Sequence, residues 1–380
     1  MPGTNQNNPA TNPAANAAAR AALFQQGFFS SIEMPSQAWA DGGSFSFQLP
    51  HSGIGLYAQL RFTGTLTWTD TATNPIAPVL SKLAPFNLIQ SVKYVDYLGN
   101  TRISAGGPSL HAIETFKYYA NTAGETTNTT ASRGYSNTLI DAFTPGSTSA
   151  TGVAYDFEVQ VPFSFHENTT VGSLPFTVPA GNNMIYVTLN PLLNTGTINA
   201  ESPLQLGSGG HASTTTATAT GSIYCTYYYI DPQPGQALPL MDFAQVYEIV
   251  DVKSTDNLAA SATKTVILPT GRTYQSLYAQ LVNGGTLTDA NVSEMKFLIN
   301  ESTPTLDEFY NSYLHRTRRT YGRDMLAGEF MWDLRQRPIS PSNYGSIALQ
   351  LLLGSGFTAS GETFFNLTKE SLYFLQNAVY

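Results

Sequence analysis

The sequence predicts an all-β protein made of two tandem eight-stranded jelly rolls, a double jelly roll in which each roll has one short helix. Apolar and polar residues alternate with period two along many short segments. Clusters of Gly, Pro, Asn and Thr separate these segments, as turns require. Residues 56–67 read LYAQLRFTGTLT and residues 277–288 read LYAQLVNGGTLT, which agree at nine of twelve positions. Such a repeat indicates a tandem duplication of one β-rich unit.

The clearest predicted strand is AYDFEVQVPFSF, residues 154–165. Tyr155 and Phe157 point to one face, and Asp156 and Glu158 point to the other. This is the pattern of a half-buried antiparallel strand. The same pattern predicts strands at 44–49, 55–68, 87–98, 184–190 and 221–230, and again at 264–269, 276–281, 294–300, 329–334, 345–353 and 371–376.

Each half also contains one segment with helical periodicity. In the first half this segment is 106–121, and in the second half it is 303–322. Thr303 is the expected N-cap of the second helix and Pro304 its first residue. Asp307 then lies in the first turn, where a negative charge suits the helix dipole.

The order of elements matches between the halves and predicts three parts. Residues 1–36 form a mobile N-terminal arm, 37–237 the first jelly roll and 238–380 the second. The nearest competing fold is a Greek-key immunoglobulin-like sandwich, which no Cys…Trp…Cys spacing supports.

The duplication makes a geometric prediction. Leu56 and Leu277 should occupy equivalent strands, and Pro162 should lie near the position equivalent to Pro338.

The arm has two different stretches. Residues 1–20 are rich in Asn, Ala and Pro and cannot bury enough apolar surface to fold alone. Leu23, Phe24, Phe28 and Phe29 then form an apolar stripe. Two interpretations stay open: the stripe packs on its own domain, or it reaches a neighbouring subunit or another shell component.

Composition excludes several classes of protein. Only 12% of the 380 residues are charged, about half of the ~25% usual in soluble domains, so the surface either lies outside the cytosol or is covered by neighbouring subunits. The net charge of −8 argues against a specific nucleic-acid partner. We expect the single cysteine, Cys225, to be an inert core residue. We expect neither a membrane-spanning helix nor a signal peptide.

No motif for catalysis, a cofactor or a metal is present, so we expect a protein that is not an enzyme and has no such site residues. The histidines are scattered without metal-ligand spacing: His51, His111, His166, His211 and His315. Of these, His111 and His315 fall on the predicted helices, where a surface or interface position is expected. Asp156 and Glu158 are the one carboxylate pair that a glycosidase could use, but such a pair is usually the solvent side of a strand.

The one basic cluster lies at the end of the second predicted helix. It consists of Arg316, Arg318, Arg319 and Arg323. In an acidic chain such a cluster favours ion pairs across a subunit contact. The candidate subunit-contact residues are therefore Leu23, Phe24, Phe28, Phe29, Arg316, Arg318 and Arg319.

Four segments carry a resemblance to a known family: FNLIQSVKYVD (86–96), QALPLMDFAQVYEI (236–249), HRTRR (315–319) and RPISPSNYGSIAL (337–349). With the duplicated architecture, they resemble the tectivirus-type double jelly-roll major capsid protein. The resemblance implies a structural protein of a bacteriophage virion, made in the host cytoplasm. It implies homotrimers of pseudo-hexagonal outline that tile an icosahedral shell over an internal membrane. It also implies contacts with neighbouring trimers, with vertex or cement proteins, and of the arm with the membrane.

The alternative is a tandem β-sandwich that binds carbohydrate or acts on glycosides. Aromatic-rich loops and a carboxylate pair would serve that function, while the missing secretion signal counts against it. The oligomeric state distinguishes the two, since a stable trimer favours the shell protein and a monomer the sugar-binding module.

Overall fold

The structure is a computed structural model of the chain. It describes residues 13–81, 83–118, 149–177, 181–195, 202–207, 209–232, 245–300, 303–321, 325–335, 338–341 and 345–374. All structural statements below concern these residues.

The first jelly roll consists of two four-stranded layers that enclose one core. The outer layer has the order β1 (Phe28–Glu33), β12 (Thr215–Asp231), β4 (Ile54–Asp70) and β8 (Ser149–Pro162), and the short β2 (Gln37–Ala38) also pairs with β12. The facing layer has the order β3 (Ser44–Leu49), β9 (Asn183–Leu189), β6 (Ile89–Val95) and β7 (Thr101–Ala105). Alternate residues of these strands point inward, as the burial of Phe45, Phe47 and Leu49 on β3 illustrates.

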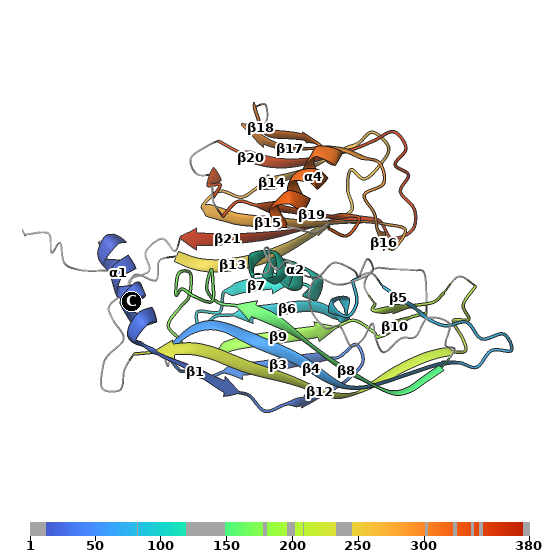
Figure 1. Ribbon diagram of the computed structural model, residues 1–380, viewed down its shortest axis with the longest axis horizontal. Coiled ribbons are helices and arrows are strands. Elements are labelled where there is room, and N and C mark those ends of the chain that lie inside the picture. The colour runs from blue at the N-terminus through green and yellow to red at the C-terminus, as the bar shows by residue number, and fades with distance from the viewer. Residues whose placement is uncertain are drawn as a thin grey trace, which may run out of the picture.

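The second roll repeats this order strand for strand. One layer is β13 (Gln245–Ser254), β21 (Phe364–Phe374), β15 (Arg272–Asn283) and β19 (Glu329–Asp333), with β16 (Thr286–Leu287) beside β15. The facing layer is β14 (Thr263–Leu268), β20 (Ile347–Leu353), β17 (Val292–Ile299) and β18 (Thr303–Phe309). The rolls are stacked, with the second above the first in Figure 1. The predicted pair of eight-stranded jelly rolls is therefore confirmed.

Small elements complete the first roll. They are the 3₁₀ turn η1 (Phe86–Leu88) and a three-stranded sheet of β10 (Leu193–Asn194), β11 (Leu204–Gln205) and β5 (Val79–Leu80).

The repeated LYAQL segments occupy equivalent strands, as predicted. Tyr57 on β4 lies between Pro162 and Tyr228, and β4 lies between β8 and β12. Likewise, β15 lies between β19 and β21. The predicted match of Pro162 with Pro338 is wrong, because the residue opposite Tyr278 is Met331.

Pro338 instead lies next to a residue that forms an isolated β-bridge. Its neighbour Ile339 forms an isolated bridge with Tyr274, as Pro175 does with Ile54 in the first roll. Proline lacks a backbone N–H and so favours strand ends. Pro162 is the last residue of β8, whereas Pro338 lies next to the bridge at Tyr274, so these two prolines are not equivalent.

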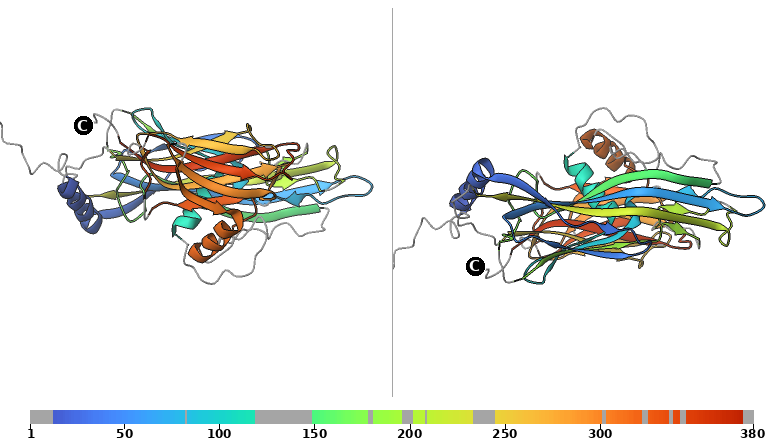
Figure 2. Two further views of the ribbon diagram at one scale, coloured as in Figure 1. Left: turned by 90° about the horizontal axis from the view of Figure 1, so that it is seen from above. Right: turned by 90° about the horizontal axis from the view of Figure 1, so that it is seen from below.

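The helices are α2 (Gly107–Tyr118) and α4 (Tyr310–Tyr321), which lie on the same side of the stacked sheets (Figure 2). Helix α2 lies where the sequence predicts it. Helix α4 begins six residues after its predicted first residue, Pro304, because Thr303–Phe309 is the strand β18, paired with β17. Thr303 and Pro304 are thus not a helix start, and Asp307 lies in a strand. Pairing with β17 satisfies the backbone groups of this segment and outweighs its local helical pattern.

The N-terminal segment is a helix followed by an edge strand. Helix α1 (Pro13–Gln26) turns at Gly27 into β1, which pairs with β12. A Cβ on Gly27 would lie 2.6 Å from the Leu23 carbonyl oxygen and 2.7 Å from that of Asp231, so only glycine fits this corner. Strand β1 lies within residues 1–36, the predicted arm, and pairs with a strand of the first roll. Among the described residues, no helix has the length and apolar character needed to cross a membrane.

Candidate functional site

The two rolls meet at a junction with continuous backbone hydrogen bonding. Strand β13 of the second roll pairs in parallel with β7 of the first, with Ile249 opposite Ile103. This pairing joins strands of both rolls into one nine-stranded sheet. Ile249 is fully buried and belongs to the core of the first roll. We call the contact of β7 and α2 with β13, β15, β19 and the residues that follow β19 the seam.

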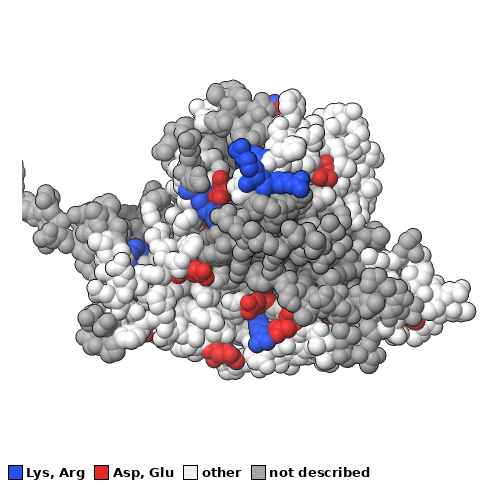
Figure 3. All heavy atoms as spheres, viewed as in Figure 1, with Lys and Arg blue, Asp and Glu red and all other residues white. Residues whose placement is uncertain are grey.

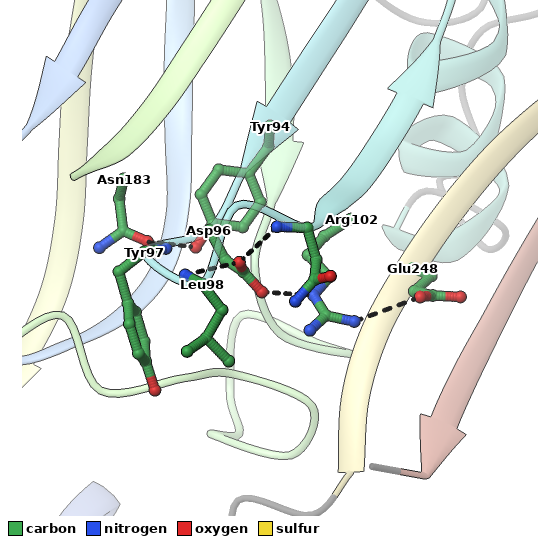
Figure 4. A network of polar contacts seen from close by, with 8 residues as sticks. Tyr94, Asp96, Tyr97, Leu98, Arg102, Asn183 and Glu248 are labelled. Carbon is green, nitrogen blue, oxygen red and sulfur yellow. Dashed lines mark hydrogen bonds and ion pairs between the residues drawn. The ribbon is translucent and has the colours of Figure 1, made fainter. Parts of the chain in front are cut away.

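A buried ion-pair network crosses the seam (Figure 4). Arg102 on β7 donates through Nε to Asp96 Oδ2 at 2.6 Å, and its Nη1 lies 3.4 Å from Glu248 Oε1 on β13. Arg272 on β15 donates to the other Glu248 oxygen at 2.9 Å. Arg102, Asp96 and Glu248 are 3%, 1% and 5% exposed. Charges this deeply buried are tolerated when they are paired, so the network ties the rolls together in one geometry.

Helix α2 of the first roll is held at both ends by the second roll. Asp251 Oδ2 on β13 accepts the Gly106 N–H and the Ser109 hydroxyl, each at 2.9 Å. At the other end, Arg335 Nη2 donates to the Phe116 carbonyl oxygen at 3.2 Å. A carboxylate at the N-terminus and a guanidinium at the C-terminus both complement the helix dipole.

The middle of α2 packs on the second roll. Ala112 and Phe116 form a buried apolar cluster with Tyr278 of β15 and Met331 of β19. These four side chains are at most 2% exposed. The seam therefore combines sheet pairing, ion pairs, helix capping and apolar packing, and the two rolls act as one body.

A cavity of about 310 Å³ lies beside Asp251 at the seam. Its lining includes Ser109, Asn190, Lys253 and Asn366. Burial raises the pKa of Asp251, against the lowering effect of the hydrogen bonds from Gly106 N–H and from side chains. The folded state therefore holds the Asp251 proton more tightly than the unfolded state does.

This raised pKa predicts a pH-dependent effect of Asp251→Asn. Below the pKa that Asp251 has in the unfolded state, the side chain is protonated in both states and its full contribution to stability is present. This contribution is lost as the pH rises through the higher pKa of the folded state. Relative to the parent protein, Asp251→Asn should therefore become more stable as the pH rises above the unfolded pKa of about 4. Each unit of pKa elevation corresponds to about 1.4 kcal/mol. Urea unfolding at a series of pH values measures the difference.

Asp256→Asn is the matched control. The Asp256 carboxylate is 67% exposed and accepts from Lys264 Nζ at 2.8 Å. That bond lowers the pKa of Asp256 to about 2, so this variant should lose stability relative to the parent as pH rises from below that value. Equal pH profiles for the two variants would contradict the account of Asp251.

The predicted contact residues fall into two separate groups. Arg318 and Arg319 are exposed on α4, and the Arg316 guanidinium lies 5.5 Å from the Tyr313 ring centroid. Arg323 lies outside the described residues. Basic side chains gather on the second roll, above a mixed group of basic and acidic side chains on the first (Figure 3).

The apolar stripe of the arm divides into a buried and an exposed part. Leu23 is 5% exposed and packs in a cluster with Leu56 and Ile230, with Phe24 against its edge. Phe28 and Phe29 are 50% and 56% exposed. The first interpretation thus applies to Leu23 and Phe24, while Phe28 and Phe29 stay predicted contact residues.

A groove of about 350 Å³ adjoins Phe29 on the outer face of the first roll. Leu56, Tyr57, Tyr228 and Glu167 also line it. Tyr57 and Tyr228 stack with ring centroids 4.5 Å apart. This groove and α4 lie on different rolls, so the structure does not bring the two groups of predicted contact residues together within one chain.

The remaining candidates have structural roles. His111 is 1% exposed and stacks on Phe86 with ring centroids 3.5 Å apart, so the expected surface or interface position is wrong. Helix α2 packs against η1, β8 and β15, which buries the ring. Cys225 is buried as predicted, and burial raises the pKa of its thiol. Within the described residues, no group of three or more His, Cys, Asp or Glu side chains is placed to hold a metal ion.

Asp156 and Glu158 lie on the outer face of β8. Asp156 forms a two-point ion pair with Arg61, which faces Glu158 across the sheet, and the Arg61 and Asp156 side chains are 54% and 42% exposed. An exposed carboxylate already paired with a guanidinium fits the solvent side of a strand, as the sequence favoured.

Comparison with known proteins gives a sequence relative and several structural ones. No protein-family model matches the chain. Major capsid protein P3 of Enterobacteria phage PRD1 is 24% identical over 344 residues, which cover 86% of this chain and 83% of that protein.

Among solved structures, the STIV MCP, from Sulfolobus Turreted Icosahedral Virus, has a TM-score of 0.63 and 15% sequence identity. The match covers 92% of this chain and 97% of the STIV MCP chain. The PBCV-1 virus capsid has a TM-score of 0.56 and 13% identity, with 91% and 94% covered. The major capsid protein P2 of Bacteriophage PM2 has a TM-score of 0.50 and 11% identity, with 93% and 100% covered. The chain is a double jelly roll. Its sequence is similar to that of a tectivirus-type major capsid protein, as the four quoted segments indicated.

The double jelly roll depends on seam residues that the sequence analysis missed, including Arg102, Glu248, Asp251 and Arg335. One signal was present. Strand β13 reads VYEIVDV over residues 246–252, a nearly continuous apolar run with two acids. A run without alternation is typical of a strand covered on both faces, and acids inside it need partners from another element.

Proposed function

We propose that this chain is the major capsid subunit of an icosahedral virus and that its role is geometric rather than enzymatic. The single observation that carries the proposal is the agreement over most of the chain with major capsid protein P3 of Enterobacteria phage PRD1. The shared fold with the solved capsid proteins supports it. The subunit then resides in the shell of the virion and is made in the host cytoplasm.

The duplicated architecture supports a homotrimer. Two matching rolls per chain supply six similar rolls from three chains, which gives a pseudo-hexagonal outline suited to a lattice. The seam supports this role, because a rigid pair of rolls presents its outer surfaces at a constant angle. Arg316, Arg318, Arg319, Phe28 and Phe29 are the proposed contact residues.

The finer parts of the proposal rest on the resemblance alone. They are an internal membrane under the shell, contact of the N-terminal residues with it, and binding of vertex or cement proteins. The net charge of −8 supports a role without a specific nucleic-acid partner.

We expect the purified chain to be a trimer. Size-exclusion chromatography with light scattering should give three times the 41.0 kDa chain mass, and negative-stain micrographs should show particles of hexagonal outline. A monomer at all accessible concentrations, together with specific binding on a glycan array, would contradict the capsid role and favour the carbohydrate-binding alternative.

A further inference from the structure

The seam has two halves, and the duplication gives each roll a copy of both. One half is the edge strand β7 with helix α2, whose counterparts on the second roll are β18 and α4. The other half is the edge strand β13 with the β15 face, whose counterparts on the first roll are β1 and β4. Within the described residues, β1 and β18 are the end strands of their sheets. The chain thus presents both halves of a second junction at its two ends.

The helices of the two halves correspond residue by residue. Both α2 and α4 have 12 residues. The strands before them share an irregularity, since the register shifts just before Ile103 and just before Leu306, at equivalent places. The counterparts of Ser109, Ala112 and Phe116 are therefore Ser312, His315 and Arg319.

These counterparts differ in exposure. The three α2 residues face the second roll and are 2%, 0% and 2% exposed. The three α4 residues form the same face at the same spacing, and all are exposed. A helix face that is covered at the seam is thus uncovered on α4.

The sheet halves show the same contrast. Thr368 on β21 lies opposite both Tyr278 and Asp251, as Tyr228 on β12 lies opposite both Tyr57 and Ser31. It follows that Phe29 is the counterpart of Ile249. Ile249 is fully buried against β7, whereas Phe29 is 56% exposed.

Among the residues that the structure describes, exposed phenylalanines are confined to the two free halves. In the described part of the chain they are Phe28 and Phe29 on β1, and Phe309 at the end of β18, which is 71% exposed. The adjacent side chains of Phe28 and Phe29 thus form an exposed apolar patch, and contiguous patches of this kind mark interaction surfaces.

Charge distinguishes the free halves from the seam. At the seam, Arg335 meets the end of α2 at Phe116. The counterpart of Phe116 is Arg319 on α4. On the first roll, Glu167 lines the groove with Phe29 and Tyr57. Burial, with Tyr228 and then Glu167 as further causes, raises the pKa of Tyr57 to about 12. The groove thus has an aromatic lining with one acidic side chain, whereas α4 carries Arg318 and Arg319 in its last turn.

We propose that a second copy of this chain fills the free junction: α4 of one copy docks in the groove of the next, and β18 pairs in parallel with β1, Leu306 opposite Phe29. The inference rests on the proposed trimer and specifies its subunit contact. Such a head-to-tail contact uses different surfaces on the two partners and closes into a ring when the rotation allows. Three chains then form a ring of six rolls. Around this ring, the contact between the two rolls of one chain alternates with the contact between rolls of neighbouring chains.

Charge reversal tests the contact in the full-length chain. Arg319→Glu and Glu167→Arg should each raise the concentration at which the trimer half dissociates by about ten-fold or more, because each places like charges together. The double variant should recover most of the loss. Lys93→Glu is the charge-reversal control, because Lys93 is exposed on β6 and lies outside both free halves. Light scattering on dilution, with thermal melting to verify folding, measures all four.

A disulfide gives a second readout. Phe29→Cys combined with Leu306→Cys should yield covalent trimers on non-reducing gels, since paired strands bring Cα atoms within disulfide range. Phe29→Cys alone should yield none. If the parent protein is a trimer and neither the charge reversals nor the cysteines respond as stated, this contact is wrong and the capsid role stands. If the parent protein is a monomer throughout, the proposed function itself fails.

Discussion

Replacing Arg102 with methionine should lower the free energy of unfolding by about 3–5 kcal/mol, the range for breaking a buried ion pair. Methionine keeps most of the side-chain length but removes the guanidinium. The carboxylates of Asp96 and Glu248, 1% and 5% exposed, then lose their shared partner. Asp96 keeps two backbone N–H donors from its own turn and Glu248 keeps Arg272, so the loss falls on the link between the rolls.

Arg61→Met is the matched control. Arg61 also pairs with a carboxylate through two hydrogen bonds, but both side chains are about half exposed. Exposed pairs contribute about 0–1 kcal/mol, so this variant should change stability little. Chemical denaturation followed by circular dichroism measures both. Equal effects of the two substitutions would show that burial at the seam does not increase the contribution of the Arg102 ion pair to stability.

Truncating Leu23 to alanine should lower the free energy of unfolding by about 2–5 kcal/mol, the range for a buried leucine. Leu23 is 5% exposed and covers Ile54 and Ile230 of the first roll. One turn earlier, Arg20 is 7% exposed and its guanidinium binds the Thr170 carbonyl and hydroxyl oxygens. The C-terminal half of helix α1 is therefore packed against the first roll.

Gln25→Ala, on the exposed side of the same helix, should leave stability nearly unchanged. Thermal melting of the trimer and of a diluted sample separates the two interpretations of the stripe. A Leu23→Ala effect seen at high concentration and absent on dilution would assign Leu23 to a subunit contact and contradict its packing within the chain.

The strands and the duplication could be predicted because their signals are local. Alternation of apolar and polar residues reports which face of a strand is buried, as on β3 and β8. The LYAQL repeat identifies equivalent strands directly. Helix α4 shows the limit of local patterns, since Thr303–Phe309 reads as a helix start and yet pairs with β17.

The sequence by itself determined two matching β-rich units, their order along the chain and an apolar stripe before the first roll. Only the tertiary structure decided how the units join, because the seam depends on residues far apart in sequence. Arg102 and Glu248 lie 146 positions apart, and each resembles a surface charge until the other is placed beside it. The same holds for Asp251, which accepts from a helix of the other roll. Burial of such groups is set by long-range packing, which no local pattern encodes.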